Sequence, residues 1–404
     1  MRKRLLFVDD EPLVLQGLRR ALHCMREEWE MNFVESGAAA LEVLGREAYD
    51  VVITDMRMPG MDGAELLEEV KRRHPAIVRM VLSGQSSREA VLRSISPTHQ
   101  YLSKPCDPHE LKLRLAQAFA MRDLLENQSV KALVSGLKSI PSLPALYDEV
   151  MAELQSADPS LAKIGGIVSK DIAMAAKILQ LANSAFIGLR CHVSSPTQAV
   201  CMIGLDMVRA LVLSVHVFSQ FEGRDPAGAH WSSLWEHSLM VAGLAQRIAM
   251  AENCSRLMVD ESCTAGLIHD VGKAVLLAEM PTEYGAILKR IAADPTTRMC
   301  AEREQLGCTH AEVGAYLMGI WGLPHPLVQA VAFHDRPSAS AEQRFSPLTA
   351  VHAADAIASP PDGPLLNRDT QLDEKYLAEL GLSQKESLWR SLYQEQVNRN
   401  GDSL

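Results

Sequence analysis

The sequence predicts an α/β domain with a doubly wound, five-stranded parallel sheet, followed by an all-α domain. In residues 1–120, short runs of β-branched residues and leucine alternate with stretches of helical spacing. After Asp107 the spacing stays helical, and only turns that contain Pro, Gly or Asn interrupt it. The 404 residues suffice for two or three domains that each bury a core of their own.

The five strands are expected at the short apolar runs Arg4–Val8, Met31–Val34, Val51–Thr54, Val78–Leu82 and Gln100–Leu102. The segments between them carry apolar residues at helical spacing, for example at Leu13 and Leu18 and again at Leu66 and Val70. Parallel sheets of this kind carry their sites at the carboxyl ends of the strands. The residues that follow each strand are therefore the first candidates for function.

A single long helix is predicted over residues 111–137, because this stretch contains no proline and its first glycine is Gly136. Such a helix would be a semi-rigid relay between the domains. Further helices are expected up to about residue 359, where Ser-Pro-Pro-Asp-Gly-Pro predicts a break, and two more over 370–396. The predicted division is an α/β domain at 1–122, a helical linker at 123–138, a helical domain at 139–340 and a helical extension at 341–404.

The charge balance disfavours nucleic acid as a partner. The chain has 40 basic and 50 acidic residues and a net charge of −10, whereas binding to a phosphate backbone needs a basic field. The first apolar run extends only from Leu5 to Val8, too short for a signal peptide. No run of about 18 apolar residues appears anywhere. We therefore expect a cytoplasmic protein without a membrane partner.

Acidic side chains follow two strands that should be neighbours in the sheet. Asp9 and Asp10 follow the first strand and Asp55 follows the third, so their carboxylates are expected to converge. Crowded carboxylates need a cation, and hard oxygen ligands in this number suit Mg²⁺. Ser83 and Lys104, beyond the fourth and fifth strands, can contact phosphoryl oxygens. The set predicts phosphoryl transfer to Asp55, whereas helix capping would explain only one aspartate at a time.

These residues stand in motifs that resemble the receiver domain of bacterial response regulators over residues 1 to about 122. The motifs are Phe-Val-Asp9-Asp10-Glu-Pro, Thr-Asp55-Met-Arg-Met-Pro-Gly-Met-Asp-Gly63, Leu-Ser83-Gly and Tyr-Leu-Ser-Lys104-Pro105. The resemblance implies a flavodoxin-like fold in which Asp55 accepts phosphate from a sensor histidine kinase. It also implies a Mg²⁺ site formed by Asp9, Asp10, Asp55 and the backbone carbonyl of Arg57. Ser83 and Tyr101 would form the switch, and the Lys104–Pro105 bond would be cis.

Histidines and aspartates in the helical part form a second candidate site. The residues that stand out are His237, the pair His269-Asp270 with Lys273 after it, His310, His334 and Asp355. Helical bundles build metal sites from imidazole and carboxylate ligands on several helices. For His310 alone, a role as a helix cap or simple hydrogen-bonding residue is an equal alternative.

This pattern resembles the HD superfamily of metal-dependent phosphohydrolases. The resemblance implies one divalent transition metal on His237, His269, Asp270 and Asp355. His310 and His334 would hold a second metal in members with two metals, and Lys273 would face the phosphate. A water that bridges two metals could then attack a phosphodiester.

A closer resemblance is to the HDOD branch of that superfamily, over roughly residues 133–340. Its motifs here are Ile-Pro-Ser-Leu-Pro144, Asp171-Ile-Ala-Met-Ala-Ala-Lys-Ile-Leu-Gln-Leu-Ala-Asn183, Ala199-Val-Cys-Met-Ile-Gly204 and Trp321-Gly-Leu-Pro324. HDOD domains are mostly described as signalling outputs without demonstrated hydrolysis. The chain also lacks the Gly-Tyr-Pro signature of cyclic-dinucleotide hydrolases, and Phe333 replaces the first histidine of their histidine pair.

The sequence thus predicts a two-component response regulator in which phosphorylation of Asp55 changes the conformation of an HDOD output domain. That output would act on a downstream signalling protein that the sequence does not name, and a homodimer is left open. The alternative is a receiver-regulated metal-dependent phosphohydrolase that uses the retained HD residues on a cyclic dinucleotide. An output that binds nucleic acid is disfavoured, because no helix-turn-helix with a basic recognition helix stands out.

Overall fold

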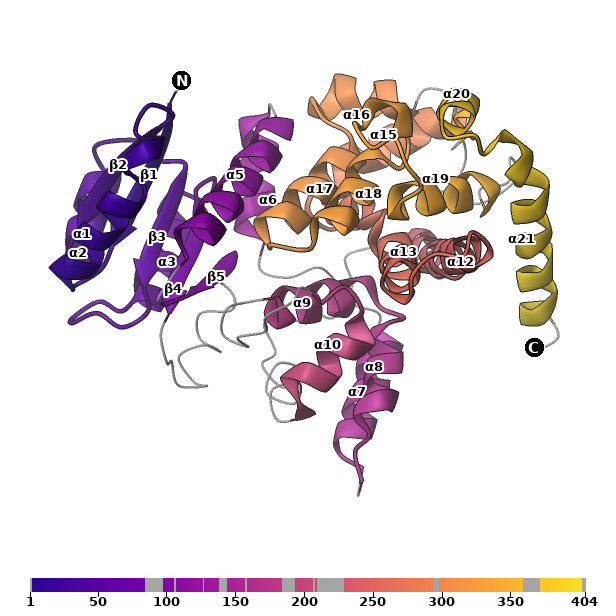
Figure 1. Ribbon diagram of the computed structural model, residues 1–404, viewed down its shortest axis with the longest axis horizontal. Helices are drawn as coiled ribbons and strands as arrows, with labels where there is room; N and C mark the ends of the chain where they lie inside the picture. The colour runs from indigo at the N-terminus through magenta and orange to yellow at the C-terminus, as the bar shows by residue number, and fades with distance from the viewer. Residues whose placement is uncertain are drawn as a thin grey trace.

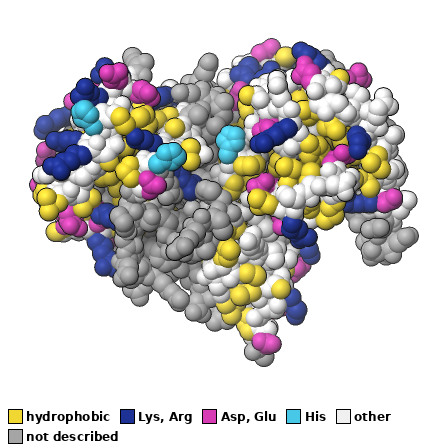
Figure 2. All heavy atoms as spheres, in the orientation of Figure 1, with side chains coloured by type: hydrophobic (Ala, Val, Ile, Leu, Met, Phe, Trp, Pro, Cys, Tyr) yellow, Lys and Arg dark blue, Asp and Glu magenta, His cyan; other side chains and the backbone are white. Residues whose placement is uncertain are grey.

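The computed structural model shows the two predicted units side by side, the α/β domain at the amino-terminal end of the chain and the helical domain after it (Figure 1). It describes residues 2–83, 97–104, 107–125, 127–137, 144–156, 158–183, 193–205, 208, 229–293, 298–358 and 371–401. The predicted break at 359–364 lies outside these residues. On the face drawn in Figure 2, basic side chains lie among acidic ones in both domains.

The predicted sheet is confirmed. Its strands are β1 (Lys3–Val8), β2 (Trp29–Val34), β3 (Val51–Asp55), β4 (Val78–Ser83) and β5 (Gln100–Ser103). All neighbours are parallel, in the order β2-β1-β3-β4-β5. Every residue of β3 is buried, and successive residues of β1 alternate between two hydrophobic clusters, one on each face. The helices of this domain are α1 (Pro12–Ala21), α2 (Gly37–Leu44), α3 (Gly63–Arg73) and α5 (Pro108–Leu124).

The rest of the described chain is helical, as predicted, and contains no strand after β5. Its first helices are α6 (Gln128–Gly136), α7 (Pro144–Leu154), α8 (Leu161–Val168), α9 (Ile172–Ala182) and α10 (Pro196–Ile203). The next are α12 (Ala229–Ala251), α13 (Arg256–Ile268), α14 (Val271–Glu279), α15 (Pro281–Ala293) and α16 (Arg298–Leu306). The last are α17 (His310–Ile320), α18 (His325–Phe333), α19 (Pro347–Ala358), α20 (Glu374–Glu379) and α21 (Glu386–Gly401). Among them, no helix is both long and apolar enough to cross a bilayer.

The single helix predicted over 111–137 is wrong. Helix α5 ends at Leu124 and α6 begins at Gln128, and Leu125 between them is extended, with φ −99° and ψ 111°. Asn127 stabilises the break, because its side-chain oxygen accepts hydrogen bonds from two backbone N–H groups of α6. Its Nδ2 also donates to the carbonyl oxygen of Leu306, 2.7 Å away. A cap with a tertiary contact thus outweighs the absence of proline and glycine.

The two domains share an interface around α5 and α6, which lie between the sheet and α17 (Figure 1). One hydrophobic cluster runs from the sheet residue Ile53 through Leu115 of α5 to Leu317 of α17. Arg79 of β4 is buried and donates to the carbonyl oxygen of Ser135 in α6. Burial lowers the pKa of Arg79 to about 10. The interface is therefore an apolar core with buried hydrogen bonds, like the interior of one domain.

Candidate phosphoacceptor and metal sites

Three charged side chains meet at the carboxyl edge of the sheet. Asp9 follows β1, Asp55 ends β3 and Lys104 follows β5. The Nζ of Lys104 lies 2.7 Å from an oxygen of Asp9 and 2.5 Å from an oxygen of Asp55. Burial would lower the pKa of Lys104, but hydrogen bonds to Asp55 and Asp9 outweigh burial and raise it. One cation therefore joins two carboxylates that would otherwise repel each other.

Backbone groups orient the two carboxylates. The N–H of Glu11 donates to Asp9 Oδ1 at 3.0 Å, and the N–H of Arg57 donates to Asp55 Oδ2 at 2.9 Å. The loop after β3 returns very close to the strand, because a Cβ at Gly63 would lie 2.1 Å from the carbonyl oxygen of Asp55. Only glycine fits there. The sequence therefore fixes the position of Asp55 through a tight loop as well as through the strand.

The other predicted residues of this site lie around it. Asp10 is partly buried at the edge of the pair, and Tyr101 is buried within β5. Ser83 ends β4, but its side chain and Pro105 lie outside the described residues. The donor set consists of carboxylate oxygens with one partly exposed member, which fits Mg²⁺ and its preference for oxygen ligands and retained waters.

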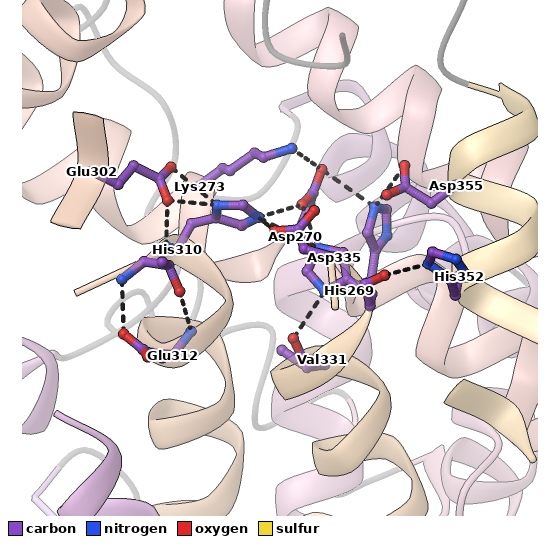
Figure 3. A network of polar contacts seen from close by, with 12 residues as sticks. His269, Asp270, Lys273, Glu302, His310, Glu312, Val331, Asp335, His352 and Asp355 are labelled. Carbon is purple, nitrogen blue, oxygen red and sulfur yellow. Dashed lines mark hydrogen bonds and ion pairs between the residues drawn. The ribbon is translucent and has the colours of Figure 1, made fainter. Parts of the chain in front are cut away.

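The histidines and aspartates that the sequence singled out in the helical domain converge in one buried cluster, to which several helices contribute (Figure 3). Its predicted members are His237 of α12, His269 and Asp270 between α13 and α14, His310 at the start of α17, His334 after α18 and Asp355 of α19. Below, these six residues together with Asp335 are called the HD cluster.

The ligand atoms of the HD cluster form three overlapping groups in which every pair lies within 4.8 Å. The groups are His237, His269 and Asp355; then His269, Asp270 and His334; then His310, His334 and Asp335. Within the first, His237 Nε2 lies 2.8 Å from Asp355 Oδ1. His269 links the first group to the second, and His334 links the second to the third, so the two metal positions expected from the sequence merge into one continuous set of candidate ligands.

Hydrogen bonds fix which nitrogen of each histidine faces inward. The Nδ1 of His269 donates to the carbonyl oxygen of Gly266 at 2.7 Å, and the Nδ1 of His334 donates to that of Val331 at 2.9 Å. Their Nε2 atoms are therefore free to act as acceptors or metal ligands. Among the described residues, neither His269 Nε2 nor the buried Asp270 Oδ1 has a hydrogen-bond partner. His269 Nε2 instead lies 3.3 Å from Asp270 Oδ2, and Asp270 Oδ1 lies 3.4 Å from His310 Nε2. Buried polar atoms that are paired only at these distances fit a bound cation.

His310 is oriented by a buried carboxylate. Glu302 of α16 lies 2.9 Å from both the backbone nitrogen and the Nδ1 of His310, which each donate to it (Figure 3). The Nε2 of His310 then points into the cluster, 3.3 Å from His334 Nε2. This geometry favours the ligand interpretation of His310, since the helix cap of α17 is provided by Thr309.

Charge is distributed unevenly across the HD cluster. Burial would lower the pKa of His269, but the nearby carboxylates of Asp270 and Asp355 raise it to about 10. Burial would also lower the pKa of His310, but the charges of Glu302 and Asp335 outweigh burial and raise it to about 9. The cluster thus compensates its carboxylates with protons where a metal is not bound.

Lys273, which the sequence places opposite a phosphate, lies inside the cluster. Its side chain is 4% exposed, and its Nζ lies 2.7 Å from Asp270 Oδ2. Beside Asp335 there is a small pocket of about 60 Å³, lined in part by Phe333 and Arg336. That volume holds water but no nucleotide.

Sequence reasoning assigned no role to Glu302, Asp335 or His352, although His352 stands out in the sequence His352-Ala-Ala-Asp355. Asp335 directly follows His334, so the Phe-His-Asp sequence was the available signal. His352 donates from Nδ1 to the carbonyl oxygen of His334 and accepts the N–H of Asp373. Glu302 stands eight residues before His310, and no sequence spacing connects the two.

The sequence matches the response regulator receiver domain family over residues 5–116 and the HDOD domain family over residues 140–337. It is similar to an uncharacterized protein of Treponema pallidum, with 25% identity over 264 residues, 64% of this chain and 48% of that protein. It is also similar to the hydrogenase transcriptional regulatory protein HoxA of Cupriavidus necator, with 37% identity over 121 residues, 30% of this chain and 24% of HoxA. The chain thus spans about half or less of the length of these relatives.

Among solved structures, the chain is similar to the MmoQ response regulator from Methylococcus capsulatus. The identity is 27%, with 62% of this chain and 98% of that chain covered and a TM-score of 0.47. A receiver domain of an HD domain-containing protein from Pseudomonas fluorescens is 30% identical, with 30% of this chain and 98% of that chain covered and a TM-score of 0.29. The two family matches cover both of the domains described above, in the same order. The chain therefore belongs to the response regulators in which a receiver domain precedes an HDOD domain.

Proposed function

We propose that this response regulator acts in the cytoplasm and accepts a phosphoryl group on Asp55 from a sensor histidine kinase, with Mg²⁺ bound at the neighbouring carboxylates. The observation that carries the proposal is the convergence of Asp9, Asp55 and Lys104 at the carboxyl edge of the sheet. When bound, Mg²⁺ would neutralise charge on the transferred group. Asp55 would supply the attacking oxygen, and Lys104 would pair with the new phosphoryl oxygens.

Phosphorylation then changes the HDOD domain, which acts on a downstream signalling protein. The physical basis is that the phosphoacceptor site and the interface with the helical domain are joined through the same strand, β5. The output requires only a modest free energy, since coupling between sites is typically about 1–3 kcal/mol.

The test is incubation of the full chain with acetyl phosphate and Mg²⁺, followed by intact mass measurement. One phosphoryl group should be added to the wild type and none to Asp55→Asn. Asp62→Asn is the matched control, because Asp62 caps α3 near the site and asparagine caps nearly as well. Wild-type phosphorylation of Asp55→Asn would refute the acceptor.

We propose as a second function that the HD cluster binds divalent metal and supports phosphodiester hydrolysis. The inward-facing Nε2 atoms of His269, His310 and His334 support this proposal. A metal there would supply an activated water. Asp270 and Asp355 would bind it directly, and Lys273 would hold Asp270 in place. Phe333 and the small pocket weigh against rapid turnover of a bulky substrate.

Metal analysis of the purified chain, with Mn²⁺ or Fe²⁺ supplied, tests the binding part. His269→Ala should lose the metal and, by mass action, unfold at lower temperature when metal is present. A phosphodiesterase assay with a cyclic dinucleotide tests the hydrolytic part. Turnover in the wild type that His269→Ala abolishes would establish the enzyme, and metal retained by His269→Ala would exclude the site.

A further inference from the structure

One helix connects the receiver domain to the HD cluster. Helix α17 begins with His310, whose Nε2 faces the cluster. Its last turn lies against the receiver domain, where the Nε2 of Gln100 donates to the carbonyl oxygen of Gly319 at 3.2 Å. The guanidinium of Arg114 in α5 donates to the carbonyl oxygen of Gly322 at 3.3 Å. With 11 residues, α17 spans about 16 Å between these two ends.

The receiver side chains add hydrogen-bond donors at the end of α17, where the carbonyl oxygen of Gly319 also accepts the N–H of Gly322 at 3.0 Å. The last carbonyls of a helix need outside donors, and a cation near them is favoured by the helix dipole. Gly322 allows this approach, because its φ is +72° and a Cβ there would lie 3.2 and 3.3 Å from Gln100 and Arg114. The receiver domain therefore forms part of the C-terminal cap of an output helix.

The same strand connects this cap to the phosphoacceptor. Gln100 is the first residue of β5, and Lys104 follows its last residue. At that end, the Nζ of Lys104 pairs with Asp55. Any change in the Asp55–Lys104 pair thus acts on a four-residue strand whose other end is hydrogen-bonded to α17.

The opposite end of α17 has little room to move without changing the HD cluster. A Cβ at Gly272 of α14 would lie 1.8 Å from the carbonyl oxygen of His310, so α14 and α17 touch through their backbones. Gly272 directly follows Val271, the first residue of α14, and Asp270 caps that helix. A shift of α17 along its axis therefore moves His310 relative to Asp270.

We propose that the receiver domain sets the metal affinity of the HD cluster through β5 and α17, with Gln100 and Arg114 as the residues that transmit its state. The proposal rests on the metal-binding function proposed above, whose regulation it names. Phosphorylation at Asp55 changes the position of β5, the cap of α17 follows, and His310 moves toward or away from Asp270.

The experiment measures Mn²⁺ affinity of the full chain by equilibrium dialysis, with and without beryllofluoride as a phosphoryl mimic at fixed Mg²⁺. Binding that remains in His269→Ala is subtracted, because it belongs to other sites. The two states should differ by at least about 5-fold in the wild type. The ratio of the Mn²⁺ affinities with and without beryllofluoride should fall to one in the double variant that carries both Gln100→Ala and Arg114→Ala. Lys112→Ala is the control, because Lys112 lies on α5 but contacts Cys24.

A second measurement separates failure of the coupling from failure of the metal site. Amide hydrogen exchange of α17 should change on beryllofluoride binding in the wild type and not in the double variant. If Mn²⁺ binds but the ratio is one in the wild type, the coupling is wrong and the metal site stands. If no Mn²⁺ binds, the metal function fails, and unchanged exchange in α17 would then overturn the coupling as well.

Discussion

A single lysine pairs with buried carboxylates at each site. Lys104 lies between Asp9 and Asp55 in the receiver domain, and Lys273 pairs with Asp270 in the HD cluster, each with one nitrogen–oxygen distance of 2.7 Å. An uncompensated buried carboxylate is costly, so each lysine stabilises a site in which metal also binds according to our proposals. The two sites differ in access, because Lys104 is 22% exposed in its side chain and Lys273 is 4% exposed.

Asp10 provides a prediction at the residue scale. Asp10→Ala should abolish Mg²⁺-dependent phosphorylation of Asp55, because the partly buried Asp10 is the member of the set most open to a hydrated cation. Without Mg²⁺ the variant should be as stable as the wild type or more so, since one of several crowded negative charges is gone. Thermal unfolding with and without Mg²⁺ measures both effects, and an unchanged Mg²⁺ response would contradict the assignment.

Glu302 provides a second prediction at the residue scale. Its carboxylate accepts hydrogen bonds from the Tyr284 hydroxyl and from two nitrogens of His310. Glu302→Gln replaces one acceptor oxygen by an NH₂ donor, so one donor must face another. Metal affinity of the HD cluster should fall about 10–100-fold, as on loss of an orienting carboxylate.

The control for that variant is Glu304→Gln on the same helix, where the glutamate is exposed and pairs with Arg290. It should leave metal affinity unchanged. Metal titration over a range of pH distinguishes orientation from folding, because loss of the Glu302 carboxylate should also shift the pH at which the metal is released. Equal affinity in Glu302→Gln and the wild type would show that Glu302 does not orient a ligand.

At the scale of elements, the contact between α14 and α17 depends on two glycines. A Cβ at Gly272 would meet the backbone of His310, and one at Gly314 would lie 3.1 Å from the backbone nitrogen of Gly272. Helices that approach this closely need residues without side chains at the crossing. The close approach brings His310 and Asp270, from different helices, to within 3.4 Å.

The substitution Gly272→Ala should therefore destabilise the helical domain by about 1–3 kcal/mol or more, because backbone atoms cannot yield as side chains do. Gly285→Ala in α15 is the matched control, with no atom within 4 Å of its added Cβ. It should stabilise by about 0.5–1 kcal/mol through helix propensity. Urea unfolding of both variants measures the difference, and equal stabilities would disprove the backbone contact.

The break between α5 and α6 changes the relay expected from the sequence. A continuous helix would carry rotation from one domain to the other, so that inserted residues would turn the output. Instead the helix is interrupted before Asn127, which caps α6 and donates a hydrogen bond to the carbonyl oxygen of Leu306 at the end of α16. The domains are joined by packing of α5 and α6 against α17 rather than along one helix axis.

At the scale of the whole molecule, a buried lysine lies where the two domains meet. Lys177 of α9 lies with its Nζ 4.7 Å from the centre of the Trp321 ring. Burial, and to a lesser degree the charge of Lys71 in the receiver domain, lowers the pKa of Lys177 to about 7. The neighbouring Gln180 donates to the carbonyl oxygen of His99, which fixes α9 against the sheet.

The contribution of Lys177 to the stability of the chain should therefore rise with pH between about 7 and 10. In this window the unfolded chain keeps a proton on Lys177 that the folded chain has lost, so raising the pH favours folding. Lys177→Met removes this titrating group. The free energy of unfolding of the variant should therefore exceed that of the wild type most below pH 7, and the difference should shrink toward pH 10.

Urea unfolding at several pH values measures this difference. Lys163→Met is the control, because the side chain of Lys163 is 72% exposed, and its difference from the wild type should not follow the same curve. A pH-independent difference for Lys177→Met would mean that Lys177 keeps its ordinary pKa.

The sequence by itself determined the order of the domains, the sheet and the residues at its carboxyl edge. The reason is local, because alternating apolar runs specify strands, and a parallel sheet brings Asp9, Asp55 and Lys104 to one edge without further information. It also identified six residues of the HD cluster, because their pattern of histidines and aspartates resembles that of the HD superfamily.

Only the tertiary structure decided which helices meet. Glu302, the break at Leu125 and the cap of α17 by Gln100 and Arg114 depend on residues that are far apart in the chain. Helical periodicity shows which face of a helix is buried but not which helix covers it. Contacts between faces are chosen by packing of the whole core, so the contacts that lie between Asp55 and the HD cluster exist only in the folded molecule.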